Sequence, residues 1–108
     1  YKDAIKGWHL HEKLILNYIC ILGMVKIAMY DLRENSPTYK KIQEVFIGDD
    51  NYCLVHIPVG VANGTKGLTT PYSIIANIAS EPHNFSVDYR KIDPYSNEIP
   101  YDWTRKDF

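Results

Sequence analysis

The 108-residue sequence lacks an excess of charge of either sign: 12 Lys and Arg stand against 13 Asp and Glu, a formal net charge of −1 with His neutral. A general nucleic-acid-binding protein needs a strongly basic face to displace counterions, so the sequence predicts no nucleic-acid partner. Apolar residues form 45% and charged residues 23% of the chain, which are ordinary fractions for a globular protein and argue against disorder. The length corresponds to a single domain, residues 1–108.

Long apolar runs are absent as well. The most apolar stretch, residues 14–30, is shorter than a membrane span and is interrupted by Asn17, Gly23 and Lys26. The sequence therefore predicts no transmembrane helix and no membrane partner. Because Gly23 separates two runs rich in β-branched and aromatic residues, it indicates a turn between two buried strands.

Cysteine is scarce, since Cys20 and Cys53 are the only two in the chain. Both lie in apolar runs, where a free Cys usually acts as a small core residue. A disulfide between them is the alternative, and it requires Cα atoms within about 7 Å of each other. The cysteine usage favours a reducing compartment, and we expect a cytoplasmic protein. Because the chain begins at Tyr1 without Met, we also expect N-terminal strands of the domain to precede it.

No segment keeps a helical period long enough to predict a helix, whereas clusters of Gly, Pro and Asn recur at short intervals. Short strands at this spacing are typical of a sandwich or barrel, so we expect an all-β fold. From Ser80 on, we expect an irregular but ordered tail over the barrel, because Tyr95, Tyr101 and Trp103 are unsuited to a free tail. The predicted strands are residues 4–10, 14–22, 24–31, 41–47, 52–57, 65–69 and 72–79, with a turn over 58–64.

The sharpest local motif is Lys6-Gly7-Trp8-His9-Leu10-His11. In a strand, alternate residues share a face, so His9 and His11 project together while Trp8 and Leu10 face the other way. Two imidazoles on one face suit either metal binding or proton transfer near neutral pH. The alternative is that two half-buried histidines alternate without any shared role.

A second motif, Pro58 to Gly64, has the Pro and Gly of a tight reversal. With the His-x-His strand, it resembles the two motifs of the cupin superfamily, whose fold is a double-stranded β-helix or jelly-roll barrel. Metal-binding cupins add a Glu and a further His, but here residues 14–16 and Asn63 stand at those places. Two imidazoles without a third strong ligand make a poor transition-metal site, so we expect no metal. A metal-dependent cupin with His9 and His11 as ligands is kept as a third hypothesis.

Six further segments follow one another along the chain: Asp31-Leu32-Arg33, Ser36-Pro37-Thr38, Asp50-Asn51, Pro58 to Gly64, Asp93-Pro94 and Asp102-Trp103. In sequence and in order they resemble the motifs of the dTDP-4-dehydrorhamnose 3,5-epimerase family. This resemblance implies a metal-free jelly roll without a cofactor, a homodimer, and a nucleotide-linked sugar as the small-molecule partner.

The chemistry implied by the resemblance is proton removal from carbons beside the C4 ketone of the sugar. It needs a base near neutral pKa, a group that stabilises the enolate, and an acid on the opposite face of the ring. The family's base falls at His9. Its diphosphate-binding Arg falls at Lys6, which keeps the charge and loses the bidentate fork. We expect His11, Asn63 and His83 to be substrate-binding polar groups at or near the barrel mouth.

Three departures from the family pattern concern catalysis. The enolate-stabilising Lys falls at Leu16, the second-motif His falls at Asn63, and the catalytic Tyr falls near residues 80–81. Trp8 and His11 are more similar to a less characterised branch of the family. The leading hypothesis is an epimerase-like protein that acts on or binds a nucleotide-linked 4-keto-6-deoxy sugar in polysaccharide precursor synthesis. The second is a binding module that has lost catalysis and retains sugar recognition.

Overall fold

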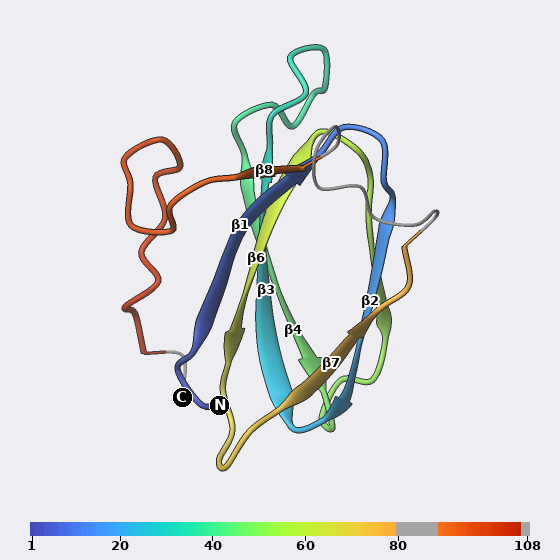
Figure 1. Cartoon of the computed structure of the whole chain (residues 1–108), viewed down its shortest axis with the longest axis vertical. Coiled ribbons are helices and arrows are strands. Elements are labelled where there is room, and N and C mark those ends of the chain that lie inside the picture. Colours follow the sequence, from blue (N-terminus) through green and yellow to red (C-terminus); the bar gives the residue numbers. More distant parts are fainter. Residues whose placement is uncertain (80–88, 107–108) are drawn as a thin grey trace.

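The computed structural model describes residues 1–79 and 89–106 and places eight strands in two antiparallel sheets (Figure 1). The five-stranded sheet has the order β4-β3-β6-β1-β8, and the three-stranded sheet has the order β5-β2-β7. The two sheets face each other, which confirms the predicted all-β jelly roll. The strands are β1 (Ile5–His11), β2 (Leu16–Leu22), β3 (Met24–Asp31), β4 (Ile42–Gly48), β5 (Leu54–Ile57), β6 (Val61–Gly67), β7 (Ile74–Asn77) and β8 (Tyr89–Lys91). None of the described residues forms a helix long and apolar enough to cross a membrane.

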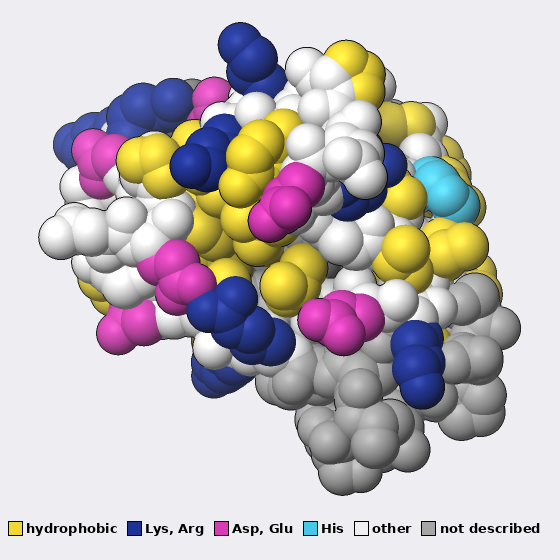
Figure 2. Space-filling view, turned by 90° about the horizontal axis from the view of Figure 1, so that it is seen from above, with side chains coloured by type: hydrophobic (Ala, Val, Ile, Leu, Met, Phe, Trp, Pro, Cys, Tyr) yellow, Lys and Arg dark blue, Asp and Glu magenta, His cyan; other side chains and the backbone are white. Residues whose placement is uncertain are grey.

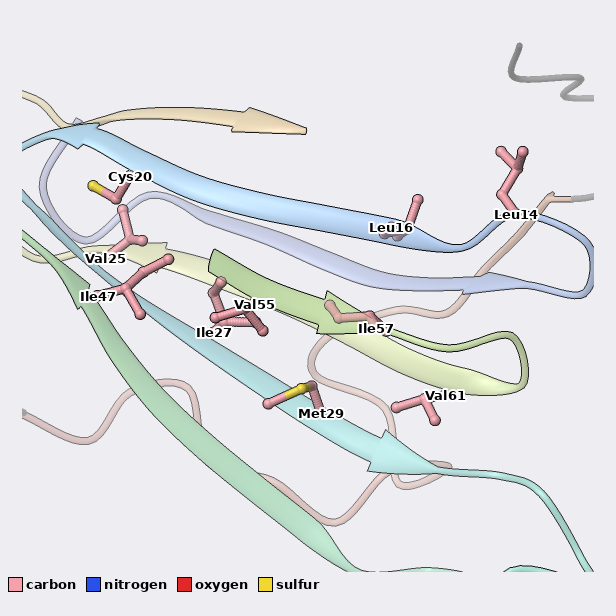
Figure 3. Packing of buried hydrophobic residues seen from close by; sticks show 10 residues of the cluster. All are labelled: Leu14, Leu16, Cys20, Val25, Ile27, Met29, Ile47, Val55, Ile57 and Val61. Carbon is pink, nitrogen blue, oxygen red and sulfur yellow. The ribbon is translucent and has the colours of Figure 1, made fainter. Parts of the chain in front are cut away.

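The space between the sheets is filled by aliphatic side chains, which we call the inner core (Figure 3). Strands β2 and β3 connect through Gly23, whose φ of 77° suits glycine. A Cβ on Gly23 would lie 2.3 Å from the Thr69 hydroxyl oxygen. The predicted turn at Gly23 is confirmed. Cys20 is a buried member, Cys53 packs against the cluster, and both thiols are free. The inner core consists of Leu14, Leu16, Cys20, Val25, Ile27, Met29, Ile47, Val55, Ile57 and Val61.

A second cluster, the outer core, lies on the opposite face of the five-stranded sheet. Its centre is Trp8, whose ring centroid is 5.1 Å from that of Trp103 and 5.7 Å from that of Tyr101. Residues 92–106 cover this face, so the prediction of an ordered C-terminal segment is confirmed for them. Tyr95 belongs to the same segment but does not pack on the barrel, because it is 67% exposed. The buried members are Trp8, Leu10, Ala28, Tyr30, Ala62, Ile92, Ile99 and Trp103.

Charged residues of the five-stranded sheet bind the C-terminal segment to the outer face of that sheet. Lys26 is fully buried, with Nζ 5.1 Å from the ring centroid of Tyr101 and 5.5 Å from that of Trp103. Glu44 accepts hydrogen bonds from Tyr101 and Arg105, and its Oε2 lies 3.9 Å from Lys26 Nζ. These contacts join β3 and β4 to the segment that follows β8.

The prediction of a turn over residues 58–64 is wrong beyond Gly60, and the strand predicted at 65–69 is confirmed only for residues 65–67. Gly60 has a φ of 82°, but residues 61–67 form β6, which pairs with both β1 and β3. Asn and Gly are depleted in strands, which is why the motif looks like a turn. Packing explains the exception: a Cβ on Gly64 would lie 2.7 Å from the Trp103 ring, so only glycine fits beneath the outer core.

Candidate functional site

Strand β1 contains one extra residue relative to its neighbour β6. Lys6 pairs with Thr65 and His9 pairs with Asn63, so three steps along β1 match two steps along β6. Regular alternation would place Lys6 and His9 on opposite faces. Because directly opposed residues of an antiparallel pair share a face, this bulge brings both side chains to the same face.

That common face is the one that lines the inner core. Asn63 is the sheet neighbour of both His9 and Met29, and Met29 belongs to the inner core. The side chain of His9 therefore projects from β1 toward the space between the two sheets, and it is half-buried there.

His11 ends strand β1 on the same face as His9. The pairing of β1 with β8 is regular from His9 to His11, while Trp8 and Leu10 pack in the outer core. This confirms the alternation that the sequence predicts. His11 is only 8% exposed, and its carbonyl oxygen accepts a hydrogen bond from the Gly60 amide at 3.0 Å. It is therefore more enclosed than His9.

Asn63 connects the two sheets through its side chain. Its Oδ1 accepts a hydrogen bond from the Tyr18 hydroxyl at 3.2 Å, and its Nδ2 donates to the carbonyl oxygen of His9 at 3.3 Å. Tyr18 belongs to β2, in the opposite sheet, so its side chain crosses the interior of the barrel. Asn63 is 1% exposed, which places this predicted mouth residue inside the barrel.

Motif-based interpretation of the sequence misses Tyr18. The available signal is its period-two spacing with Leu16 and Cys20, which are both buried in the inner core. A tyrosine at an inward position among apolar residues requires a hydrogen-bond partner for its hydroxyl, and that requirement marks the position as unusual.

Lys6 lies at the edge of the inner face. It is exposed and lines a shallow pocket together with Thr65 of β6, Val25 of β3 and Ile75 of β7. The pocket therefore opens between the two sheets on the side of β7. An ammonium group at this opening is positioned to contact an anionic part of a ligand that extends out of the barrel.

Leu16 stands where the resemblance implies an enolate-stabilising Lys, and it is 2% exposed in the inner core. The two buried lysines that the structure describes cannot replace it. Lys26 faces the aromatic rings of the outer core, and Lys66 Nζ donates to the carbonyl oxygens of Trp103 and Arg105. His83 and residues 80–81, where the catalytic Tyr was expected, lie outside the described residues.

Across residues 1–79 and 89–106, no group of three or more His, Cys, Asp and Glu side chains is arranged to hold a metal ion. The positions where the cupin resemblance implies further ligands carry the aliphatic residues 14–16 and the amide of Asn63, which are not strong transition-metal ligands.

The Asp-Leu-Arg and Ser-Pro-Thr motifs form a loop clasp at the end of β3. Asp31 is 5% exposed and accepts hydrogen bonds from Arg33 Nε and Nη2, each at 2.9 Å, and from the Thr38 hydroxyl. The Arg33 contacts hold the pKa of Asp31 well below its usual range, against the opposing effect of burial, and Ser36 and Thr38 lower the pKa further. This motif therefore fixes the chain between β3 and β4.

A second pocket lies beside this clasp. Its lining includes Asp31, Arg33, Lys41, Gln43 and His56, none of which is a predicted site residue. Figure 2 views the molecule from the end of the barrel that carries this loop: apolar side chains gather near the middle, with charged side chains of both signs around them. No single sign of charge dominates this face.

Comparison with known proteins agrees with the fold and the motifs. A family model described as dTDP-4-dehydrorhamnose 3,5-epimerase matches residues 1–107. The chain is similar to the probable low-salt glycan biosynthesis epimerase Agl13 of Haloferax volcanii (30% identity, 94% of this chain and 62% of the relative). It is also similar to the spore coat polysaccharide biosynthesis protein SpsL of Bacillus subtilis (34% identity, 94% of this chain and 64% of the relative).

Among solved structures, the dTDP sugar isomerase of Desulfovibrio desulfuricans superimposes with a TM-score of 0.87 at 28% identity, over 94% of this chain and 65% of that chain. The chain thus spans less than two thirds of the length of each of these relatives. Because the family model covers nearly the whole chain, the chain belongs to the dTDP-4-dehydrorhamnose 3,5-epimerase family.

Proposed function

We propose that this chain is an epimerase that acts on a nucleotide-linked 4-keto-6-deoxy sugar during the synthesis of polysaccharide or glycan precursors. The observation that carries the proposal is the position of His9, a half-buried imidazole on the inward face of a family barrel, beside the buried amide of Asn63. The relatives named for glycan and spore coat polysaccharide biosynthesis support this class of pathway.

In this proposal His9 is the base. It removes a proton from a carbon beside the ketone, and the electron pair of that C–H bond moves into the enolate. Lys6 contacts the diphosphate at the opening beside β7, while Asn63 and His11 contribute hydrogen bonds to the sugar from the same face. His83 is proposed as a further substrate contact. No cofactor or metal takes part.

We further propose a homodimer that forms through the outer face of the three-stranded sheet, in a cytoplasmic protein. Several apolar side chains on or near this sheet are strongly exposed, including Ile21 (54%), Leu54 (55%) and Ile78 (64%). Contiguous exposed apolar surface is a frequent mark of a protein interface. The two free cysteines agree with a reducing compartment.

A second candidate function is sugar-nucleotide binding without catalysis. Leu16 favours it, because an aliphatic side chain cannot stabilise an enolate and the position is fully enclosed by the inner core. Such a loss can slow catalysis about a hundredfold or more without preventing ligand binding.

The test is incubation with dTDP-4-keto-6-deoxyglucose in deuterated water, with NMR detection of deuterium at C3 and C5. Enzyme-dependent wash-in supports the epimerase. Nucleotide binding without wash-in supports the binding module, and the absence of both leaves only the fold in common with the family.

A further inference from the structure

Inversion at a carbon requires two groups on opposite sides of the sugar ring. A base removes the proton from one face, and an acid must return a proton to the other. In the proposed function, on which the following inference rests, His9 enters the barrel from the five-stranded sheet. We therefore expect the acid on the three-stranded sheet, which lies across the interior from His9.

Tyr18 occupies that place. It lies in β2, the central strand of the three-stranded sheet, opposite Val55, which belongs to the inner core. Its hydroxyl reaches across the barrel to Asn63 Oδ1 at 3.2 Å, and Asn63 is the direct sheet neighbour of His9. The phenol and the imidazole thus approach the same part of the interior from opposite sheets.

A hydrogen bond between side chains is unusual in this part of the interior. The inward neighbours of Tyr18 along β2 are Leu16 and Cys20, which are 2% and 1% exposed, and Asn63 itself is 1% exposed. An apolar pair would avoid the cost of removing a hydroxyl and an amide from water. Polar groups kept in an otherwise aliphatic interior are typical of positions retained for chemistry.

We propose that Tyr18 is the catalytic acid that protonates the enolate on the face opposite His9. The His9 imidazole takes the proton from the carbon beside the ketone, and the negative charge moves to the C4 oxygen. The electron pair then returns to the same carbon, which takes the proton of the Tyr18 O–H from the opposite face. Imidazolium loses its proton to water and tyrosinate gains one from water, so the protein is restored and the substrate differs only in configuration.

The test is Tyr18→Phe, which keeps the ring and removes the hydroxyl. With the 4-keto sugar nucleotide in deuterated water, NMR separates two events: wash-in of deuterium and formation of the inverted sugar. We expect inversion to fall by about a hundredfold or more, the usual contribution of a general acid. Wash-in with retained configuration should stay within about threefold of wild type, because His9 can return a solvent-derived deuteron to the face it came from.

Tyr30→Phe is the matched control, because Tyr30 is a buried tyrosine of the outer core and faces away from His9. It should leave both readouts unchanged, and a thermal melt of each variant verifies folding. An equal loss of wash-in and inversion in Tyr18→Phe would assign the phenol to enolate stabilisation and overturn the proposal. No change in either would make Tyr18 structural and overturn it as well. A wild-type chain without wash-in would overturn the proposed function first, and the role of Tyr18 with it.

Discussion

The two faces of the five-stranded sheet bury their polar groups in different ways. On the outer face, Lys26, Lys66 and Glu44 all contact the C-terminal segment, through aromatic rings, backbone carbonyls or side-chain hydrogen bonds. On the inner face, a short chain of hydrogen bonds runs from the Tyr18 hydroxyl through the Asn63 amide to the backbone carbonyl of His9, among aliphatic side chains.

From this difference we infer a structural role for the outer-face groups and propose a chemical one for the inner-face groups. The outer-face charges hold the C-terminal segment against β3, β4 and β6, and backbone hydrogen bonds join Ile92 to Trp8 of β1, the strand that carries His9. The inner-face groups join two sheets that the aliphatic core already brings together. Changes on the outer face should therefore alter stability, whereas changes on the inner face should alter binding and turnover.

The largest loss of stability is expected from Trp103→Ala. Trp103 is 1% exposed and contacts both Trp8 and Tyr101, so its removal leaves a cavity behind β1. The free energy of unfolding, measured by denaturant titration, should fall by about 3–5 kcal/mol. Tyr95→Ala, at an exposed position of the same segment, should change it by less than about 0.5 kcal/mol. Equal effects of the two variants would mean that the outer core does not hold this segment.

A smaller loss is expected from Asp31→Asn, which removes the carboxylate of the loop clasp. The free energy of unfolding at pH 7 should fall by about 2–3 kcal/mol, because Arg33 loses its charged partner. The folded-state pKa of Asp31 lies below its usual value, so its contribution is complete above about pH 4 and is lost as the pH falls further. Wild type should therefore lose more stability than Asp31→Asn between neutral and acid pH. Parallel pH profiles would contradict this account of the clasp.

Lys6→Ala tests the proposed phosphate contact at the edge of the inner face. If Lys6 contacts a phosphate, the affinity for dTDP, measured by calorimetry, should weaken by about 1–3 kcal/mol. The melting temperature should hardly change, because Lys6 is exposed. Lys40→Ala is the control, since Lys40 is a surface lysine above the Tyr39 ring in the loop after β3. Equal weakening by both variants would indicate only a general effect of charge.

The smallest effect is expected from Lys26→Met. Met keeps most of the volume and removes the charge, and replacement of a buried ion by an apolar side chain changes stability by less than about 1.5 kcal/mol. Burial alone would raise the pKa of Glu44, but the contacts with Tyr101, Arg105 and Lys26 lower it overall. In Lys26→Met, Arg105 and Tyr101 still bind Glu44, and these contacts limit the decrease in the free energy of unfolding. A loss above about 3 kcal/mol, measured by denaturant titration, would show that Lys26 itself is essential to the outer core.

The simple two-residue period of strands predicts much of how the side chains divide between the two faces of the sheet. The alternation of Trp8, His9 and Leu10 follows from strand geometry, and so does the turn at Gly23. The first part of β6, residues 61–64, could not be predicted, because Gly64 is required by the Trp103 ring that packs on it from 39 positions later in the chain. Local propensity carries no information about such a contact.

The site was predictable only in part. Sequence patterns single out His9 as the candidate base and place Leu16 where the resemblance implies a Lys. They do not predict that Lys6 shares the face of His9, because the bulge between them is defined by pairing with β6. Sequence patterns also do not predict the contact of Tyr18, because its partner Asn63 lies 45 positions away in the opposite sheet.

The most direct test of the central claim, that the inner face carries the chemistry, is deuterium wash-in by His9→Asn. The account predicts that wash-in beside the ketone is lost, while dTDP affinity stays within about twofold of wild type, because a base acts in the transition state rather than in ground-state binding. The melting temperature should also be retained, since the half-buried imidazole is replaced by a smaller polar group. Wash-in at the wild-type rate in His9→Asn would contradict the account.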